Sequence, residues 1–173
     1  GAIYIGSDVT GFANCTIYNS NFTLNKMDKS IYDGGAIYVF NTGKYLAYLN
    51  LYNSTFNNNS ARYGGAFYVV KGDIYIDGSK FNHNNASSGG AIYVNSTSTF
   101  NFINSTLNGN NATKTGVINL ITVKNVNLIN STFINNTGEQ GGVLYSYNSP
   151  FTVNVNGSTF VNNNATQEGG CFY

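Results

Sequence analysis

The stretch Gly34-Gly35-Ala36-Ile37-Tyr38-Val39 decides the fold, because variants of it return along the whole chain. The copies lie at residues 1–5, 64–69, 89–94, 116–120, 141–145 and 169–173. The last glycine of each copy recurs every 25 to 34 residues, a period that is typical of solenoid and other repeat proteins.

Each copy predicts a short strand with one buried face. Ile37 and Val39 share a parity and point to one face, whereas Tyr38 points to the other. The preceding Gly-Gly pair suits a tight corner, where a Cβ would clash or where φ is positive. A strand that recurs once per repeat and buries one face needs its counterparts in the turns above and below. The pattern therefore predicts a solenoid.

A second strand follows a polar loop of variable length, and its apolar and polar residues alternate. Its inward pairs are Cys15 and Ile17, Leu49 and Leu51, Ile74 and Ile76, Phe100 and Phe102, Val126 and Leu128, and Val153 and Val155. Two residues later an Asn or Gly predicts a one-residue bend, because these residues enter the left-handed region at low cost.

Every repeat then reads Ser-x-[Phe/Leu]-x-x-Asn. In register, the aromatic residues predict a buried column of Phe22, Phe56, Phe81, Phe133 and Phe160. The asparagines predict a ladder in which each amide bonds the copy one turn away; its members are Asn25, Asn59, Asn84, Asn110, Asn136 and Asn163. A loop of four to nine residues is expected to lead back to the next Gly-Gly pair.

Three strands and three corners per repeat predict an all-β fold, a right-handed parallel β-helix of about six turns of three short strands. We expect residues 1–173 to form a single solenoid. A leucine-rich repeat is the competing solenoid, but it needs a helical segment in each repeat. The segments left over are rich in Asn, Ser, Thr, Tyr and Gly and have no apolar period of 3.6 residues, which favours the β-helix.

Composition narrows the function. Charged residues make up 9% of the chain and the net charge is +1, which argues against a nucleic-acid partner. No apolar run approaches ~18 residues, so no membrane insertion by this segment is expected. Polarity comes instead from 31 asparagines and many Ser and Thr residues. Cys15 and Cys171 lie in the first and last repeats, too far apart for a disulfide at about 4.8 Å per turn.

The alternation of Gly-Gly-Ala-Ile with Phe-x-x-Asn in every turn resembles the polymorphic membrane proteins of chlamydiae. The Asn-, Ser- and Thr-rich sequence, as at residues 89–94 and 130–137, is still more similar to adhesin-like surface proteins of methanogenic archaea. The resemblance covers the whole chain and implies a cell-surface, adhesin-like protein with a β-helical fold. It implies no catalytic residues.

Some parallel β-helices are polysaccharide lyases or hydrolases, whose chemistry needs converging carboxylates or a carboxylate–calcium cluster. Among the acidic residues, only Asp73 and Asp77 share a strand region within one turn. His83 has no Cys, His or carboxylate companion. We therefore predict no catalytic residue, no metal site, no cofactor and no enzyme, with a polysaccharide-active enzyme as the less favoured alternative.

The outward tyrosines form a candidate contact strip, interrupted at Asn119: Tyr4, Tyr38, Tyr68, Tyr93 and Tyr145. An exposed aromatic strip can bind sugar rings or a partner surface. Stacked like residues can equally serve only to stabilise neighbouring turns. Both interpretations stay open.

Twelve Asn-x-Ser/Thr sequons occur in the chain. Four are expected in corner loops that suit glycosylation if the protein is exported: Asn58, Asn85, Asn111 and Asn164.

The function that the sequence favours is a non-enzymatic, extracellular structural or adhesion module of a cell-surface protein. Its expected partners are other cell surfaces, glycans or copies of itself. Because the sequence begins and ends at the same phase of the repeat, we expect either a segment of a longer β-helix or a subunit that stacks head to tail. The alternative function is therefore a self-assembling extracellular filament subunit.

Overall fold

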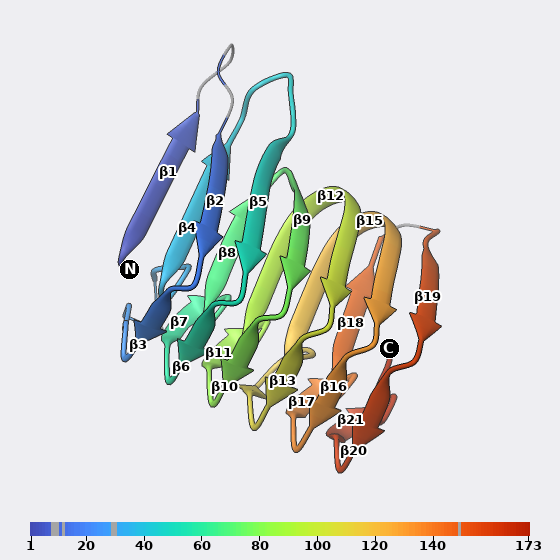
Figure 1. Cartoon of the computed structure of the whole chain (residues 1–173). Helices are drawn as coiled ribbons and strands as arrows, with labels where there is room; N and C mark the ends of the chain where they lie inside the picture. The colour runs from blue at the N-terminus through green and yellow to red at the C-terminus, as the bar shows by residue number, and fades with distance from the viewer. Residues whose placement is uncertain (8–10, 12, 29–30, 149) are drawn as a thin grey trace.

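The copies of the glycine phrase before residue 169 each lead into a strand, and these strands form the first of four rows around a parallel β-helix (Figure 1). The structure is a computed structural model that describes residues 1–7, 11, 13–28, 31–148 and 150–173. This part of the chain contains strands and turns but no helix. Its strands pair in parallel with those of neighbouring turns. The predicted fold class is confirmed.

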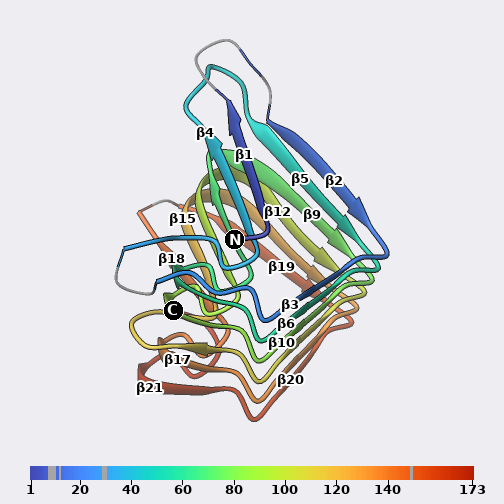
Figure 2. The ribbon, with the colours of Figure 1, turned by 90° about the vertical axis from the view of Figure 1, so that its left-hand side faces the viewer.

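The first two rows belong to one ten-stranded sheet. The first row comprises β1 (Ile3–Ser7), β4 (Ile37–Asn41), β8 (Phe67–Val70), the first parts of β12 (Ile92–Ile103) and β15 (Ile118–Ile129), and β18 (Leu144–Tyr147). The second comprises β2 (Asn14–Tyr18), β5 (Ala47–Tyr52), β9 (Gly72–Asp77), the last parts of β12 and β15, and β19 (Thr152–Asn156). Figure 2 shows the first row rising to a narrow apex and the second row descending from it.

The third row contains the Ser-x-Phe motifs, as predicted, and forms a six-stranded sheet. Its strands are β3 (Asn21–Thr23), β6 (Thr55–Asn57), β10 (Lys80–Asn82), β13 (Thr106–Asn108), β16 (Thr132–Ile134) and β20 (Thr159–Val161). The fourth row is a five-stranded sheet of β7 (Ser60–Tyr63), β11 (Asn85–Ser88), β14 (Asn111–Ala112), β17 (Thr137–Gln140) and β21 (Asn164–Glu168).

The fourth row corrects the expectation of a loop at this point. Its inward residues are small: Ala61, Ala86 and Ala112 stack in register and are buried. Gly138 and Ala165 continue the column. Alanine and glycine carry little apolar signal, so the segment reads as polar although its strands pair in parallel. Each full turn therefore has four strand segments instead of the three predicted (Figure 2).

Several corners in each turn pass through the left-handed region. The bend predicted between the second and third rows is confirmed, with φ between 47° and 62° at Asn19, Asn53, Gly78, Asn104, Asn130 and Gly157. A second corner, which the sequence analysis did not identify, precedes each ladder asparagine, with φ between 52° and 63° at Leu24, Asn58, His83, Gly109, Asn135 and Asn162. At the Gly-Gly corner, Gly64 has φ 63°, and a Cβ on Gly65 would lie 2.1 Å from the Gly90 carbonyl oxygen.

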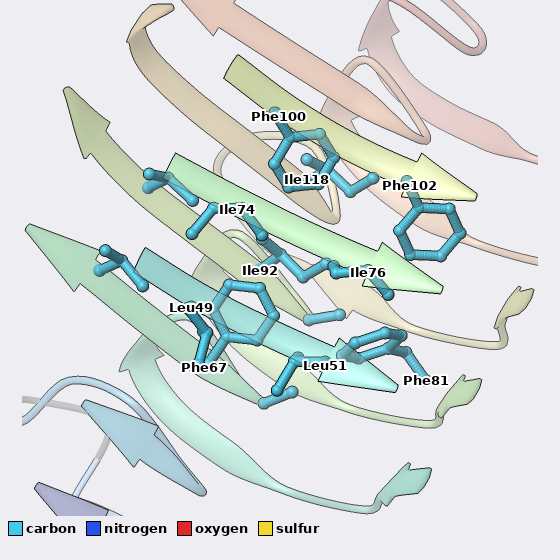
Figure 3. Packing of buried hydrophobic residues seen from close by; sticks show 14 of the residues in the cluster. Leu49, Leu51, Phe67, Ile74, Ile76, Phe81, Ile92, Phe100, Phe102 and Ile118 are labelled. Carbon is cyan, nitrogen blue, oxygen red and sulfur yellow. The ribbon is translucent and has the colours of Figure 1, made fainter. Parts of the chain in front are cut away.

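The large side chains of the core come from the first three rows (Figure 3), and the fourth row adds small ones such as Ala112. Phe22 stacks on Phe56 and Phe56 on Phe81, with ring centroids 4.8 and 4.9 Å apart. The predicted column then changes composition, because Leu107 stands between Phe81 and Phe133 in register. Phe102 from the second row lies 5.9 Å from Phe81 and 5.2 Å from Phe133, so aromatic contact continues through it.

The asparagine ladder is present as predicted. The backbone N–H and the Nδ2 of Asn59 both donate to Oδ1 of Asn84, each at 3.0 Å. The second N–H of the Asn84 amide donates to the Phe56 carbonyl oxygen at 2.9 Å. The pattern repeats from Asn25 to Asn163. Beside it the motif serines form a second ladder, for example from the Ser54 N–H to the Ser79 hydroxyl oxygen at 3.1 Å.

Candidate functional site

The tyrosine strip, defined as Tyr4, Tyr38, Tyr68, Tyr93 and Tyr145, lies on the outer face of the first row. Its first four members pair in register, and Asn119 separates Tyr93 from Tyr145 as the sequence predicts. Ring centroids are 5.4 Å apart between Tyr4 and Tyr38, 5.2 Å between Tyr38 and Tyr68, and 5.1 Å between Tyr68 and Tyr93. These contacts stabilise neighbouring turns.

The middle of the tyrosine strip is covered. Tyr4 is 66% exposed, but Tyr68 is only 9% exposed. Tyr63 lies 5.0 Å from Tyr93, and the Arg62 guanidinium stacks over Tyr63 while its Nε donates to Oδ1 of Asp33 at 2.9 Å. Burial raises the pKa values of Tyr68 and Tyr93. The stacked tyrosines therefore stabilise neighbouring turns, which is one of the two roles that the sequence left open. The strip offers a ligand less exposed aromatic surface than the row of outward tyrosines in the sequence implied.

A second aromatic surface covers the outer face of the second row, which we call the second-row face. Tyr18 stacks on Tyr52 with centroids 4.8 Å apart, and Tyr52 lies 5.7 Å from Tyr75. Tyr48, at the start of the same strand as Tyr52, is 45% exposed. The apolar–polar alternation of this row predicted only that its outward positions are polar. The signal that could have found the surface is three outward tyrosines at residues 48, 52 and 75 around an aspartate at 73.

The second-row face carries a surface hollow of about 390 Å³ over β5, β9 and β12. Its lining residues are Tyr48, Asn50, Tyr52, Asp73, Ile74, Tyr75, Thr99 and Asn101. The volume is near the lower end of the range of small-molecule sites, roughly 300–1,000 Å³. The lining combines rings, amides and one carboxylate, and it includes no lysine or arginine.

The carboxylate of Asp73 is held in place. Its Oδ1 accepts hydrogen bonds from the Ser98 N–H at 2.8 Å, the Thr99 N–H at 2.9 Å and the Thr97 hydroxyl at 3.2 Å. Asp77 accepts one from Nδ2 of Asn104 at 2.9 Å. Neither aspartate forms an ion pair with another described residue.

The arrangement of the carboxylates bears on catalysis. Asp73 and Asp77 stand four residues apart on β9, about 13 Å along an extended strand, whereas glycosidase pairs lie roughly 5–9.5 Å apart. Asp33 pairs with Arg62, and Glu139 accepts from the Gln167 amide of the next turn in the fourth row. Within the described ranges, no three His, Cys, Asp or Glu side chains gather in a group that could hold a metal ion.

The four candidate glycosylation sites fall in two environments. Asn58 is exposed at a left-handed corner, in agreement with its predicted position. Asn85, Asn111 and Asn164 are instead the first residues of β11, β14 and β21, and they stack with Thr137 in one outward column. The expectation that these three lie in corner loops is wrong, because the fourth row is a sheet. Their modification stays a prediction.

Cys15 and Cys171 are free thiols, each partly buried, and burial raises the pKa of both.

No helix long and apolar enough to cross a membrane is found among the described residues. A family model described as a right-handed β-helix region matches residues 1–173. No curated protein and no solved structure matches the chain. The match agrees with the predicted handedness of the winding, and it covers the tyrosine strip and the second-row face alike.

Proposed function

Because this chain belongs to the right-handed β-helix family, we propose that it is a non-enzymatic structural and adhesion module of an extracellular cell-surface protein. The observation that carries the proposal is the second-row face, a flat outer surface with stacked tyrosines, amides and a hollow. Its partners would be glycans or other cell surfaces, because aromatic rings beside hydrogen-bonding groups suit both.

The interior supports a structural role. The buried amide and serine ladders satisfy their hydrogen bonds turn by turn, which gives an extended scaffold without a large compact core. The separation of Asp73 from Asp77 along β9 favours a binding surface over a catalytic one. Glycans on Asn58, Asn85, Asn111 or Asn164 would fit an exported protein, and they would add glycan-sized steps to the 18.7 kDa mass of the polypeptide.

The experiment that tests the proposal is antibody labelling of the cells that produce the protein, before and after permeabilisation, together with an assay for reducing ends released from polysaccharides. We expect labelling of intact cells and no release of reducing ends. Labelling that needs permeabilisation would contradict the extracellular location, and polysaccharide cleavage would favour the enzyme. Sedimentation of the same material separates a discrete module from the alternative, a filament whose size grows with concentration.

A further inference from the structure

We propose that the hollow on the second-row face is a binding site for a neutral saccharide, with Tyr75 as the central contact. The inference rests on the proposed function, since it names the ligand class of the adhesive surface. It concerns a different face from the tyrosine strip.

The hollow is arranged around Tyr75. In register, Asn50 and Asn101 flank Tyr75 in the turns on either side, about 4.8 Å away. Along β9 itself, Asp73 and Asp77 stand two residues before and after Tyr75 on the same face. The ring at the centre is thus surrounded by two amides and two carboxylates, while Tyr48 pairs with Asp73 at one edge and Tyr52 with Asp77 at the other.

These groups match the chemistry of a sugar. A pyranose ring offers apolar C–H faces that pack on aromatic rings and hydroxyl groups at its edge that donate and accept hydrogen bonds. The hydroxyls of Tyr48 and Tyr75 form no hydrogen bond with another described residue, so both remain available at the hollow. Oδ1 of Asn101 accepts from Nδ2 of Asn127 at 2.8 Å, which orients the Asn101 amide.

Asp73 supplies the hollow with a carboxylate whose orientation is fixed by the protein. Three donors fix Oδ1 of its carboxylate, so the group is oriented before any ligand arrives. Since no cation lines the hollow and neither Asp73 nor Asp77 has an ion-pair partner among the described residues, the local charge is negative. Uronates, sulfated sugars and phosphorylated sugars would meet like charge there. The ligand class is therefore neutral.

Calorimetric titration of the purified chain tests the site. The probes are cellotetraose, mannotetraose and chitotetraose as neutral oligosaccharides, and tetragalacturonate as the anionic one. We expect saturable binding of at least one neutral probe at millimolar concentration or below, and none of tetragalacturonate. Tyr48→Ala and Tyr75→Ala should each weaken binding about tenfold, as expected for the loss of one ring contact. Tyr75→Phe should retain most of it.

Tyr147→Ala is the matched control, because Tyr147 is 58% exposed on β18 of the first row, outside the hollow. Its binding should equal that of the parent. Circular dichroism checks the fold of every variant, and Tyr48→Ala, which truncates a 45% exposed side chain, keeps the test valid if Tyr75→Ala is unstable.

Three results would overturn the site: no neutral probe binds, tetragalacturonate binds best, or binding survives in both Tyr48→Ala and Tyr75→Ala. Failure here is distinguishable from failure of the proposed function. If intact cells display the protein and no neutral probe binds, the saccharide site is wrong while the surface location stands. If only permeabilised cells are labelled, the proposed function is wrong whatever the titration gives.

Discussion

At the corner between the third and fourth rows, Asn84 is 1% exposed, and its amide both accepts from Asn59 and donates to Asn110 and to the Phe56 carbonyl. On the second-row face, Asn101 is partly exposed, and among the described residues its amide bonds only with that of Asn127. Both residues belong to columns that stack in register along the same solenoid, although Tyr75 interrupts the outer column. The comparison shows that stacking in register does not by itself make an amide important for stability. Water competes for the hydrogen bonds of the outer amide, but it is excluded from those of the inner one.

Among the substitutions that test this contrast, the largest loss of stability is expected at Phe81, which is fully buried beside the asparagine ladder. Phe81→Ala should lower the free energy of unfolding by roughly 3–5 kcal/mol, because it leaves a cavity between Phe56 and the ring of Phe102. Urea unfolding followed by circular dichroism measures it. A loss below about 1 kcal/mol would mean that the core is not organised around this column.

The second largest loss of stability is expected in the asparagine ladder. Asn84→Ala removes the acceptor of the Asn59 N–H groups and the donor to the Phe56 carbonyl, and we expect a loss of about 2–4 kcal/mol from these buried, unsatisfied groups. The matched control is Asn101→Ala on the second-row face, which should change stability by no more than about 0.5 kcal/mol. Equal losses in the two variants would abolish the distinction between the inner and outer amides.

The smallest expected effect is a difference in the pH dependence of stability between variants of a buried tyrosine and of an exposed one. Burial, and then the neighbouring Tyr93 and Asp33, raises the pKa of Tyr68 above its ordinary value of 10.0. The folded state therefore binds the phenolic proton more tightly than the unfolded chain does. Stability is complete below the unfolded pKa and falls as the pH rises above about 10.

The measurement is the urea midpoint of unfolding at pH 8 and at pH 11. Between these pH values, Tyr68→Phe should lose less stability than the parent protein does. Tyr48→Phe, which changes an exposed ring, should behave as the parent. An identical pH response of all three proteins would show that Tyr68 titrates as freely as a surface tyrosine.

Much of the interior could be predicted from the sequence. The alternation at Leu49 and Leu51, the repeated Ser-x-Phe-x-x-Asn motif and the Asn or Gly bend each report a local rule of period or backbone conformation. These rules hold in every turn, so their repetition leaves one solution, strands stacked in parallel. The ladder from Asn25 to Asn163 follows from that register alone.

The fourth row and the hollow could not be predicted in the same way. Ala61, Ala86 and Ala112 show that a strand can be buried with almost no apolar signal, because each inward side chain is a single methyl group. Tyr68 and Tyr48 both occupy outward positions, yet Tyr68 is covered by its neighbours while Tyr48 borders an open hollow.

The sequence by itself therefore determined the winding, the register and the asparagine ladder, because each depends on the parity and spacing of residues along the chain. Only the tertiary structure decided which outward side chains meet solvent. Exposure depends on how side chains from adjacent turns and rows cover one another, as Tyr63 and Tyr93 cover Tyr68. The alternation of residues along one strand cannot predict this covering.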